Sequence, residues 1–154
     1  GSRRVFCIHG DAAYVRCAGE CGLGVVDLPP GLVPRGDGKL TAEERKTLTC
    51  PRCHAWLRPH VLWFDECYDE EHYRMDSALR AAGAADLLLV VGTSGATNLP
   101  MQIGRLVFRR GAALVDVNPE ENPFAELASR SETGFFARGS ACERLPAIVR
   151  ALGV

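Results

Sequence analysis

The chain lacks a strong net charge, a long hydrophobic run and a secretory signal. Its 154 residues carry 18 Lys and Arg against 19 Asp and Glu, a formal charge of −1. A nearly neutral chain has no bulk attraction for nucleic acid or for an anionic membrane surface. No stretch approaches the roughly 20 apolar residues of a membrane span, and no charged-then-apolar signal pattern opens the sequence. The composition, 47% hydrophobic, indicates an ordinary globular chain with one real core.

The seven cysteines do not suit a disulfide framework, because their number is odd and four of them form two close pairs. The pairs are Cys17-x3-Cys21 and Cys50-x2-Cys53. Each pair can place two thiolates on one tight turn, and two such turns supply the tetrahedral sulfur set of a closed structural zinc site. We expect one structural Zn²⁺ ion and a reducing, cytoplasmic location. Three cysteines are then left as free thiols: Cys7, Cys67 and Cys142.

Three parts follow from these patterns. Residues 1–14 are a lead-in strand, over Arg3 to Ile8, that runs into the turn at His9-Gly10. Residues 15–57 form the zinc-binding module, with an exposed Pro- and Gly-rich loop at 28–39 and a helix that Thr41 caps. Residues 58–154 form a layered α/β part. This division predicts a small zinc ribbon inserted beside a Rossmann-like domain.

The α/β prediction rests on apolar strands that alternate with helical patterns after residue 58. The run Leu87 to Val91 is uninterrupted and apolar, as parallel strands buried on both faces are. Strands that alternate with helices imply a mostly parallel sheet. The predicted strands are 61–64, 87–91 and 112–117; the predicted helices are 69–82, 100–110 and one that begins after Ser140.

Two small-residue turns follow the predicted strands. They are Gly92-Thr93-Ser94-Gly95 and Asn118-Pro119-Glu120. In parallel sheets, ligands bind beyond the carboxyl ends of the strands, where such turns offer backbone N–H groups to a nucleotide. A plain turn with a hydrogen-bonding Asn is an equally good interpretation of either one alone. Their shared position at one edge favours a nucleotide site.

Several short motifs follow one another along the chain in a fixed order. They are His9-Gly10, the first cysteine pair, Cys50-Pro51-Arg52-Cys53, Leu57-Arg58-Pro59-His60-Val61-Leu62-Trp63-Phe64-Asp65-Glu66, Val91-Gly92-Thr93-Ser94, Val117-Asn118 and Gly139-Ser140-Ala141. This ordered series resembles the sirtuins, the NAD-dependent protein-lysine deacylases. The stretch from Arg58 to Phe64 is most similar to the bacterial and mitochondrial branch that includes desuccinylases. The resemblance covers nearly the whole chain but only the later part of the family's catalytic core.

The resemblance implies a role for each matched residue. His9 matches the general base that acts on the NAD ribose hydroxyl, and imidazole exchanges protons near neutral pH. In that family the acyl group passes from lysine to ADP-ribose and nicotinamide is released. Val61, Phe64, Asp65 and Glu66 match the segment that pairs with an acyl-lysine peptide as an added strand. The matches for NAD binding are Gly92, Thr93, Ser94, Asn118, Pro119, Glu120 and Ala141, and those for zinc are Cys17, Cys21, Cys50 and Cys53.

Plainer interpretations stand beside these roles. A His before Gly can simply hydrogen-bond in a turn, and His54, His60 and His72 suit surface or supporting positions. The aromatic residues are expected in the core rather than as a stacking platform: Trp56, Trp63, Phe64 and Phe135-Phe136. The alternative to a deacylase is a zinc-stabilised module that binds nucleotide or peptide without catalysis.

Two departures from the family pattern matter. Asp65 stands where the family usually has Gly, and its Cβ could crowd the acyl-lysine. The Gly-Ala-Gly-x-Ser loop, the lid after it and the Gln-Asn-x-Asp segment precede the His-Gly motif in the family and have no match here. The chain is therefore expected to be a deliberate fragment, one half of a two-chain enzyme, or a subunit of a homo-oligomer that covers its open sheet edge.

Overall fold

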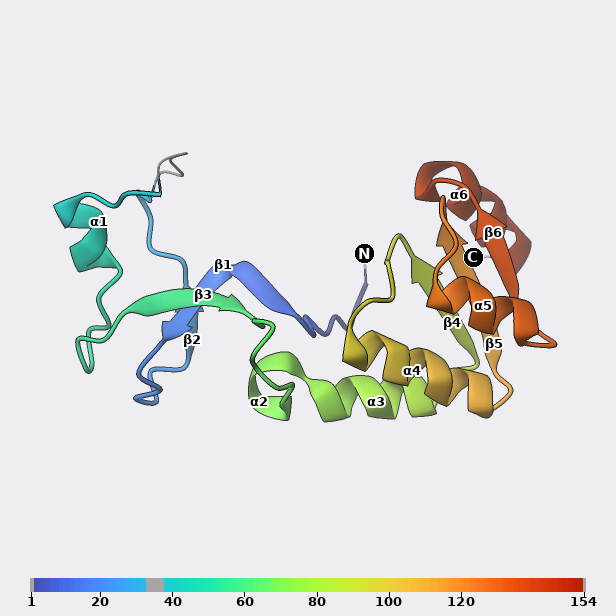
Figure 1. Cartoon of the computed structure of the whole chain (residues 1–154), viewed down its shortest axis with the longest axis horizontal. Helices are drawn as coiled ribbons and strands as arrows, with labels where there is room; N and C mark the ends of the chain where they lie inside the picture. The colour runs from blue at the N-terminus through green and yellow to red at the C-terminus, as the bar shows by residue number, and fades with distance from the viewer. Residues whose placement is uncertain (1, 33–37, 154) are drawn as a thin grey trace. The chain divides into compact units, whose positions relative to one another are not determined.

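Two units make up the chain in the computed structural model, which describes residues 2–32 and 38–153 (Figure 1). The first unit is Gly1–Arg74 and the second is Met75–Val154. The predicted three-part division stays a prediction. Its boundary at 14/15 lies within one strand, Gly10–Cys17, and its boundary at 57/58 lies within another, Leu57–Val61.

The first unit is built on a three-stranded antiparallel sheet. Its strands are β1 (Gly10–Cys17), β2 (Val25–Asp27) and β3 (Leu57–Val61), in the order β2-β1-β3. Gly10 lies opposite Val61 and Cys17 opposite Leu57, with an irregularity in β1 between these ends. The buried core of the sheet is small and contains two cysteines: Val15, Cys17, Cys50 and Leu57. So small an apolar core leaves much of the unit's stability to other interactions.

The short helix α1 (Ala42–Thr47) begins as its sequence predicts. The Thr41 hydroxyl accepts from the Glu44 N–H over 3.2 Å, and the Glu44 carboxylate accepts from the Thr41 N–H over 2.7 Å. This reciprocal capping satisfies two backbone donors that the first turn would otherwise leave unpaired. Of the predicted loop at 28–39, residues 33–37 lie outside the described part of the chain.

The predicted helix over 69–82 is wrong as a single element. It is two helices, α2 (Glu70–Tyr73) and α3 (Met75–Gly83), separated by Arg74 at φ 55°. A left-handed residue cannot continue an α-helix. Asp69 caps α2 by accepting from the His72 N–H over 2.5 Å. The boundary between the two units falls at this break, so Tyr73 belongs to the first unit and Met75 to the second.

The second unit confirms the predicted parallel α/β architecture. Its strands β4 (Leu87–Val91), β5 (Ala113–Asn118) and β6 (Phe135–Arg138) pair in parallel in the order β4-β5-β6. The helices α4 (Asn98–Arg109), α5 (Pro123–Arg130) and α6 (Ala141–Leu152) alternate with and follow these strands (Figure 1). The sequence patterns above do not indicate α5 or β6.

A close helix approach and a buried central strand hold the second unit together. In β5, Leu114 to Asn118 are all buried. A Cβ at Gly104 of α4 would overlap the ring of Phe124 in α5, and Phe124 is 2% exposed. Glycine therefore permits the two helices to pack tightly. Among the described helices, none is long and apolar enough to cross a membrane.

Three further sequence expectations are wrong. Arg3 to Ile8 form no strand, because turns that join Ile8 to Phe6 and Gly10 to Cys7 interrupt this segment. Of the predicted strand at 61–64, only Val61 lies in a strand, because β3 ends at that residue. The aromatic side chains expected in the core are largely exposed: Trp56 at 50%, Trp63 at 49%, Phe64 at 108% and Phe135 at 50%.

We predict that Gly10→Ala destabilises the first unit by about 3 kcal/mol. Gly10 has φ +80°, and a Cβ there would overlap the backbone carbonyl oxygen of His60, which cannot move aside without disrupting β3. Urea unfolding followed by tryptophan fluorescence reports on this unit, because it contains both tryptophans.

Gly24→Ala is the matched control. Gly24 has φ +77°, but nothing lies within 4 Å of the added Cβ, so only the backbone cost of about 1 kcal/mol remains. Equal losses in the two variants would contradict the close approach of the two strands at Gly10.

Candidate functional site

The four paired cysteines converge in the first unit as their spacing predicts. Their four Sγ atoms all lie within 4.8 Å of one another. The Sγ atoms of Cys17 and Cys53 are 3.3 Å apart, and those of Cys21 and Cys50 are 3.6 Å apart. A tetrahedron with Zn–S bonds of about 2.3 Å has edges of about 3.8 Å. The four cysteines are therefore positioned to bind one zinc ion.

The surroundings of the sulfurs favour a bound cation. Burial opposes ionisation of Cys17, but the backbone of Cys21, the Cys53 thiol and the backbone of Gly19 outweigh it and lower the pKa of Cys17 to about 6. The Ala55 backbone favours the Cys53 thiolate, yet the sulfurs of Cys17 and Cys21 raise the pKa of Cys53 to about 12. Like charges so close disfavour each other. All four sulfurs can ionise together only around a cation, which fits zinc.

His9 lies exposed in the turn that leads into β1. The Gly10 N–H donates to the Cys7 carbonyl over 2.8 Å, and the Leu62 N–H donates to the His9 carbonyl over 3.0 Å. The backbone of His9 is therefore hydrogen-bonded to Leu62, the residue that follows β3. The imidazole Nε2 lies 2.9 Å from the Tyr68 hydroxyl, and the ring planes are tilted by 53°.

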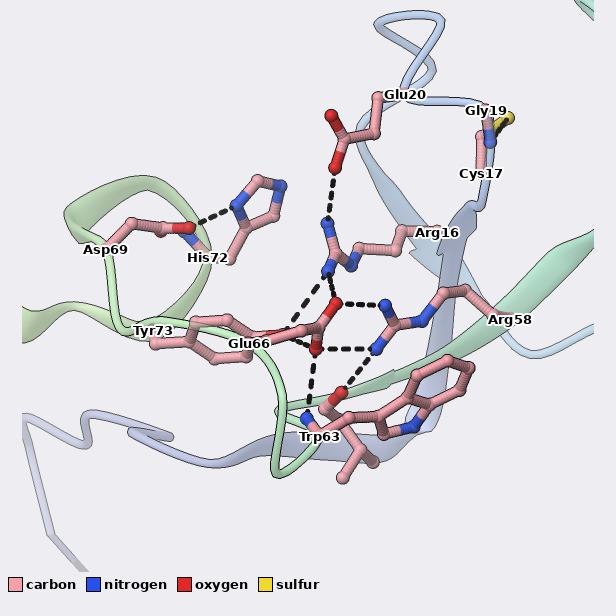
Figure 2. A network of polar contacts seen from close by, with 11 residues as sticks. Arg16, Cys17, Gly19, Glu20, Arg58, Trp63, Glu66, Asp69, His72 and Tyr73 are labelled. Atoms are coloured by element: carbon pink, nitrogen blue, oxygen red, sulfur yellow. Dashed lines mark hydrogen bonds and ion pairs between the residues drawn. The ribbon is translucent and has the colours of Figure 1, made fainter. Parts of the chain in front are cut away.

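Glu66 is the centre of the largest ion-pair network of the described residues (Figure 2). Its carboxylate accepts from both guanidinium nitrogens of Arg58 and from Arg16 over 2.8 Å. It also accepts from the Trp63 N–H over 2.9 Å and from the Tyr73 hydroxyl over 3.4 Å. Arg16 comes from β1, Arg58 from β3 and Tyr73 from α2. One carboxylate thus connects three elements.

The Arg58 guanidinium hydrogen-bonds to Glu66 and, with the Trp63 N–H and Arg16, holds the pKa of that carboxyl at about 2. Glu66 is therefore charged at any ordinary pH. A carboxyl with a lowered pKa stabilises the folded state above its unfolded pKa of about 4.5, and this contribution is lost as the pH falls toward 2.

The four residues matched to the peptide-binding segment have different surroundings. The Val61 carbonyl accepts from Arg58 over 2.7 Å, and Glu66 is occupied by the network. Phe64 and Asp65 are exposed. The structure therefore leaves the side chains of Phe64 and Asp65 accessible within this segment, while that of Glu66 supports its shape.

The candidates for nucleotide binding meet at the carboxyl edge of the second unit's sheet. The Asn118 side-chain amide donates to the Thr93 carbonyl over 2.7 Å, and the Gly92 N–H donates to the Val117 carbonyl over 3.0 Å. The Gly139 N–H donates to the Asn118 carbonyl over 3.0 Å. The three strand ends are therefore bonded to one another. The candidates at this edge are Gly92, Thr93, Ser94, Asn118, Pro119, Glu120 and Ala141.

Sequence reasoning missed the partners that support these sites. Arg16 and Tyr73 belong to no quoted motif, and Arg58 lies in the matched stretch without a role of its own, so only their contacts with Glu66 show their importance. In the second unit the sequence did offer a sign of a buried supporting group, because Asp116 is an acidic residue in the middle of an apolar strand. It is fully buried, its Oδ2 accepts from Asn122 over 2.7 Å, and burial raises its pKa.

The comparison with protein families decides the relationship. The Sir2 family model matches residues 1–98. The chain belongs to the Sir2 family. This match includes His9, the four cysteines, Glu66 and the turn Gly92-Thr93-Ser94, so the resemblance to sirtuins is confirmed.

Similar sirtuins include two bacterial proteins named NAD-dependent protein deacylase. The one from Mycobacterium tuberculosis is 35% identical over 152 residues, which cover 97% of the chain and 60% of the relative. The one from Leptospira interrogans is 32% identical over 153 residues, which cover 97% of the chain and 54% of the relative. A solved Sir2 homologue in complex with NAD has a TM-score of 0.75 at 28% identity, covering 99% of the chain and 52% of the homologue. The chain spans just over half the length of these Sir2 proteins.

We predict that Cys50→Ser removes the zinc and unfolds the first unit. Cys50 is fully buried, and structural zinc sites contribute roughly 10 kcal/mol to folding. Metal content and circular dichroism are the measurements, and Cys67→Ser, at an exposed cysteine, is the control. Retained zinc and unchanged stability in Cys50→Ser would refute the ligand assignment.

We predict that Glu66→Gln lowers the free energy of unfolding of the first unit by about 3 kcal/mol at pH 7, since two guanidinium groups lose their carboxylate. Tryptophan fluorescence during urea unfolding measures it. Glu20→Gln is the matched control, because Glu20 pairs with the same Arg16 but is 81% exposed, and its loss should cost less than about 1 kcal/mol. Equal effects would show that the network contributes no more than a surface pair.

Proposed function

We propose that the protein is part of an NAD-dependent protein-lysine deacylase of the deacetylase or desuccinylase type. The observation that carries the proposal is the likeness to proteins named NAD-dependent protein deacylase, at up to 35% identity over almost the whole chain. The chain covers only 60% or less of those relatives, so the proposal concerns a partial catalytic core.

His9 is the proposed general base. Its side chain is exposed at the end of a turn, and its backbone is fixed by the hydrogen bond to Leu62. An imidazole in such a position can take a proton from a ribose hydroxyl and release it near neutral pH. This assignment is supported by the His-Gly match and by the accessibility of the ring.

The edge at Gly92–Ser94 and Asn118–Glu120 is proposed to hold the adenosine half of NAD. Small residues leave the backbone accessible there, since nothing lies within 4 Å of a Cβ placed on Gly92. When bound, NAD supplies the ribose carbon that receives the acyl group. The residues of this chain orient the nucleotide, and Ala141 at the start of α6 completes the edge.

The chain that follows β3 is proposed to bind the acyl-lysine peptide. Within the described sheet, β3 pairs only with β1, so its second edge has no strand beside it. An extended peptide can add to such an edge through main-chain hydrogen bonds. Val61, Phe64 and Asp65 are the residues that would contact it, and Glu66 fixes the turn that carries them. The zinc ion has a structural role, since four sulfurs leave no open position.

The proposal includes a cytoplasmic location and a complementing partner. A site of four thiolates and three further unpaired cysteines suits a reducing compartment. A preceding segment of the same polypeptide, a separate N-terminal half or a second copy of the chain would supply the residues for which this sequence has no match.

We predict that zinc-loaded protein, supplied with an N-terminal half that carries the unmatched segments and mixed with NAD and an acetylated or succinylated lysine peptide, forms O-acyl-ADP-ribose and nicotinamide. His9→Ala should lower product formation at least about 100-fold, because general-base catalysis is lost, while NAD affinity stays nearly unchanged. Mass spectrometry measures the products. His54→Asn is the control, since His54 is exposed at φ 62°, a conformation that Asn tolerates.

Two outcomes would change the proposal. Equal turnover in His9→Ala would remove His9 from the mechanism. NAD or peptide binding without product from the folded, zinc-bound chain alone would make a complementing half indispensable for catalysis. Binding without product after that half is added would favour the alternative of a zinc-stabilised binding module.

A further inference from the structure

The hydrogen bond between His9 and Tyr68 is not explained by any motif in the sequence. Tyr68 follows the matched stretch that ends at Glu66 and lies before α2. Its hydroxyl is 2.9 Å from His9 Nε2, and the two ring centroids are 5.9 Å apart. The two residues are 59 positions apart in the sequence, so only the fold brings them together.

Tyr68 is held from its other side. Its ring makes an edge-to-face contact with Tyr73, with 6.5 Å between centroids and 80° between planes. Tyr73 is 1% exposed, stacks on His60 at 5.6 Å and hydrogen-bonds to Glu66. Tyr68 therefore rests on a side chain that is itself fixed by the Glu66 network, and its half-buried ring has little freedom to move.

His9 is attached to the same framework through its backbone. Its carbonyl accepts from Leu62, and the backbone of Gly10 approaches His60 too closely for any other residue. Both partners of the hydrogen bond are thus anchored near the end of β3. The bond joins two fixed points and limits rotation of an otherwise exposed imidazole.

We propose that Tyr68 is a positioning residue for His9, which rests on the role proposed above for His9 as the base. The hydroxyl engages Nε2, as donor or as acceptor, and fixes the orientation of the ring. Within residues 2–32 and 38–153, Nδ1 has no hydrogen-bond partner, so it is the nitrogen left to exchange a proton. A hydrogen bond at one ring nitrogen determines what the other can do.

The test compares ¹⁵N spectra of the imidazole nitrogens in the zinc-loaded full chain, without any turnover. Tyr68→Phe removes only the hydroxyl and keeps the ring against Tyr73. We expect the Nε2 resonance of His9 to shift toward that of a free imidazole at the same pH. Tyr14→Phe is the matched control, because Tyr14 is 40% exposed and no hydrogen bond of its hydroxyl is described; it should shift nothing.

An unchanged Nε2 resonance in Tyr68→Phe, or an equal shift in Tyr14→Phe, would overturn the inference. If Tyr68→Phe does not fold, the wild-type chain decides alone: ring relaxation of His9 as fast as that of a freely rotating side chain would show an unrestrained ring. These readouts need no catalysis, so they separate this inference from the proposed function.

Turnover then tests the consequence for the reaction. We expect Tyr68→Phe to lower kcat about tenfold, the contribution of one hydrogen bond to an imidazole that becomes charged, with KM for peptide and NAD unchanged. An unchanged kcat together with a shifted resonance would overturn the positioning role. A wild-type chain that makes no product even with a complementing half would count against the proposed function, while the spectra would still show whether Tyr68 bonds to His9.

Discussion

The carboxylate of Glu66 is the interaction on which the first unit depends. It is charged, largely shielded from water and surrounded by donors from β1, β3, α2 and its own turn (Figure 2). Burying two guanidinium groups and one carboxylate is costly unless their hydrogen bonds are made. Here the carboxylate has all its donors, while Arg16 Nε and Arg58 Nε are buried without a partner among the described residues. The bonds to Glu66 hold the segment from Trp63 to Tyr73 against the two strands. The positions of Phe64, Asp65 and Tyr68 follow from that attachment.

The cysteine cluster and the Glu66 network lie beside each other on the same pair of strands. Cys17 pairs with Leu57, and the next pair along is Arg16 with Arg58, whose guanidinium groups both bind Glu66. The buried apolar core of the sheet has only four residues, two of which are cysteines. The hydrophobic effect alone therefore supplies little stability to this sheet. A metal site and the ion-pair network next to it supply what the core does not.

The sequence predicts well those features that depend on neighbouring residues. The spacing of the cysteine pairs, the cap at Thr41 and the parallel strand over Leu87 to Val91 are all as predicted. The expected burial of that strand on both faces is wrong, because within β4 only Val90 is buried. Prediction from the sequence fails where distant contacts decide. Arg74 interrupts a helical pattern without Gly or Pro to mark the break, and the Trp63 ring lies on the Arg58 guanidinium at 3.8 Å instead of in the core. Hydrophobicity does not determine burial in so small a unit.

The role of Glu66 shows how a family motif can mislead when a role is assigned to each residue. Its place in the matched stretch implies peptide binding, yet its carboxylate already accepts hydrogen bonds from Arg16, Arg58, Trp63 and Tyr73. A group so fully used cannot bind a peptide without breaking the turn that presents Phe64. Its effect on substrate must therefore pass through the geometry of that turn. By the same reasoning, Tyr68, which no motif includes, has a direct connection to the proposed base.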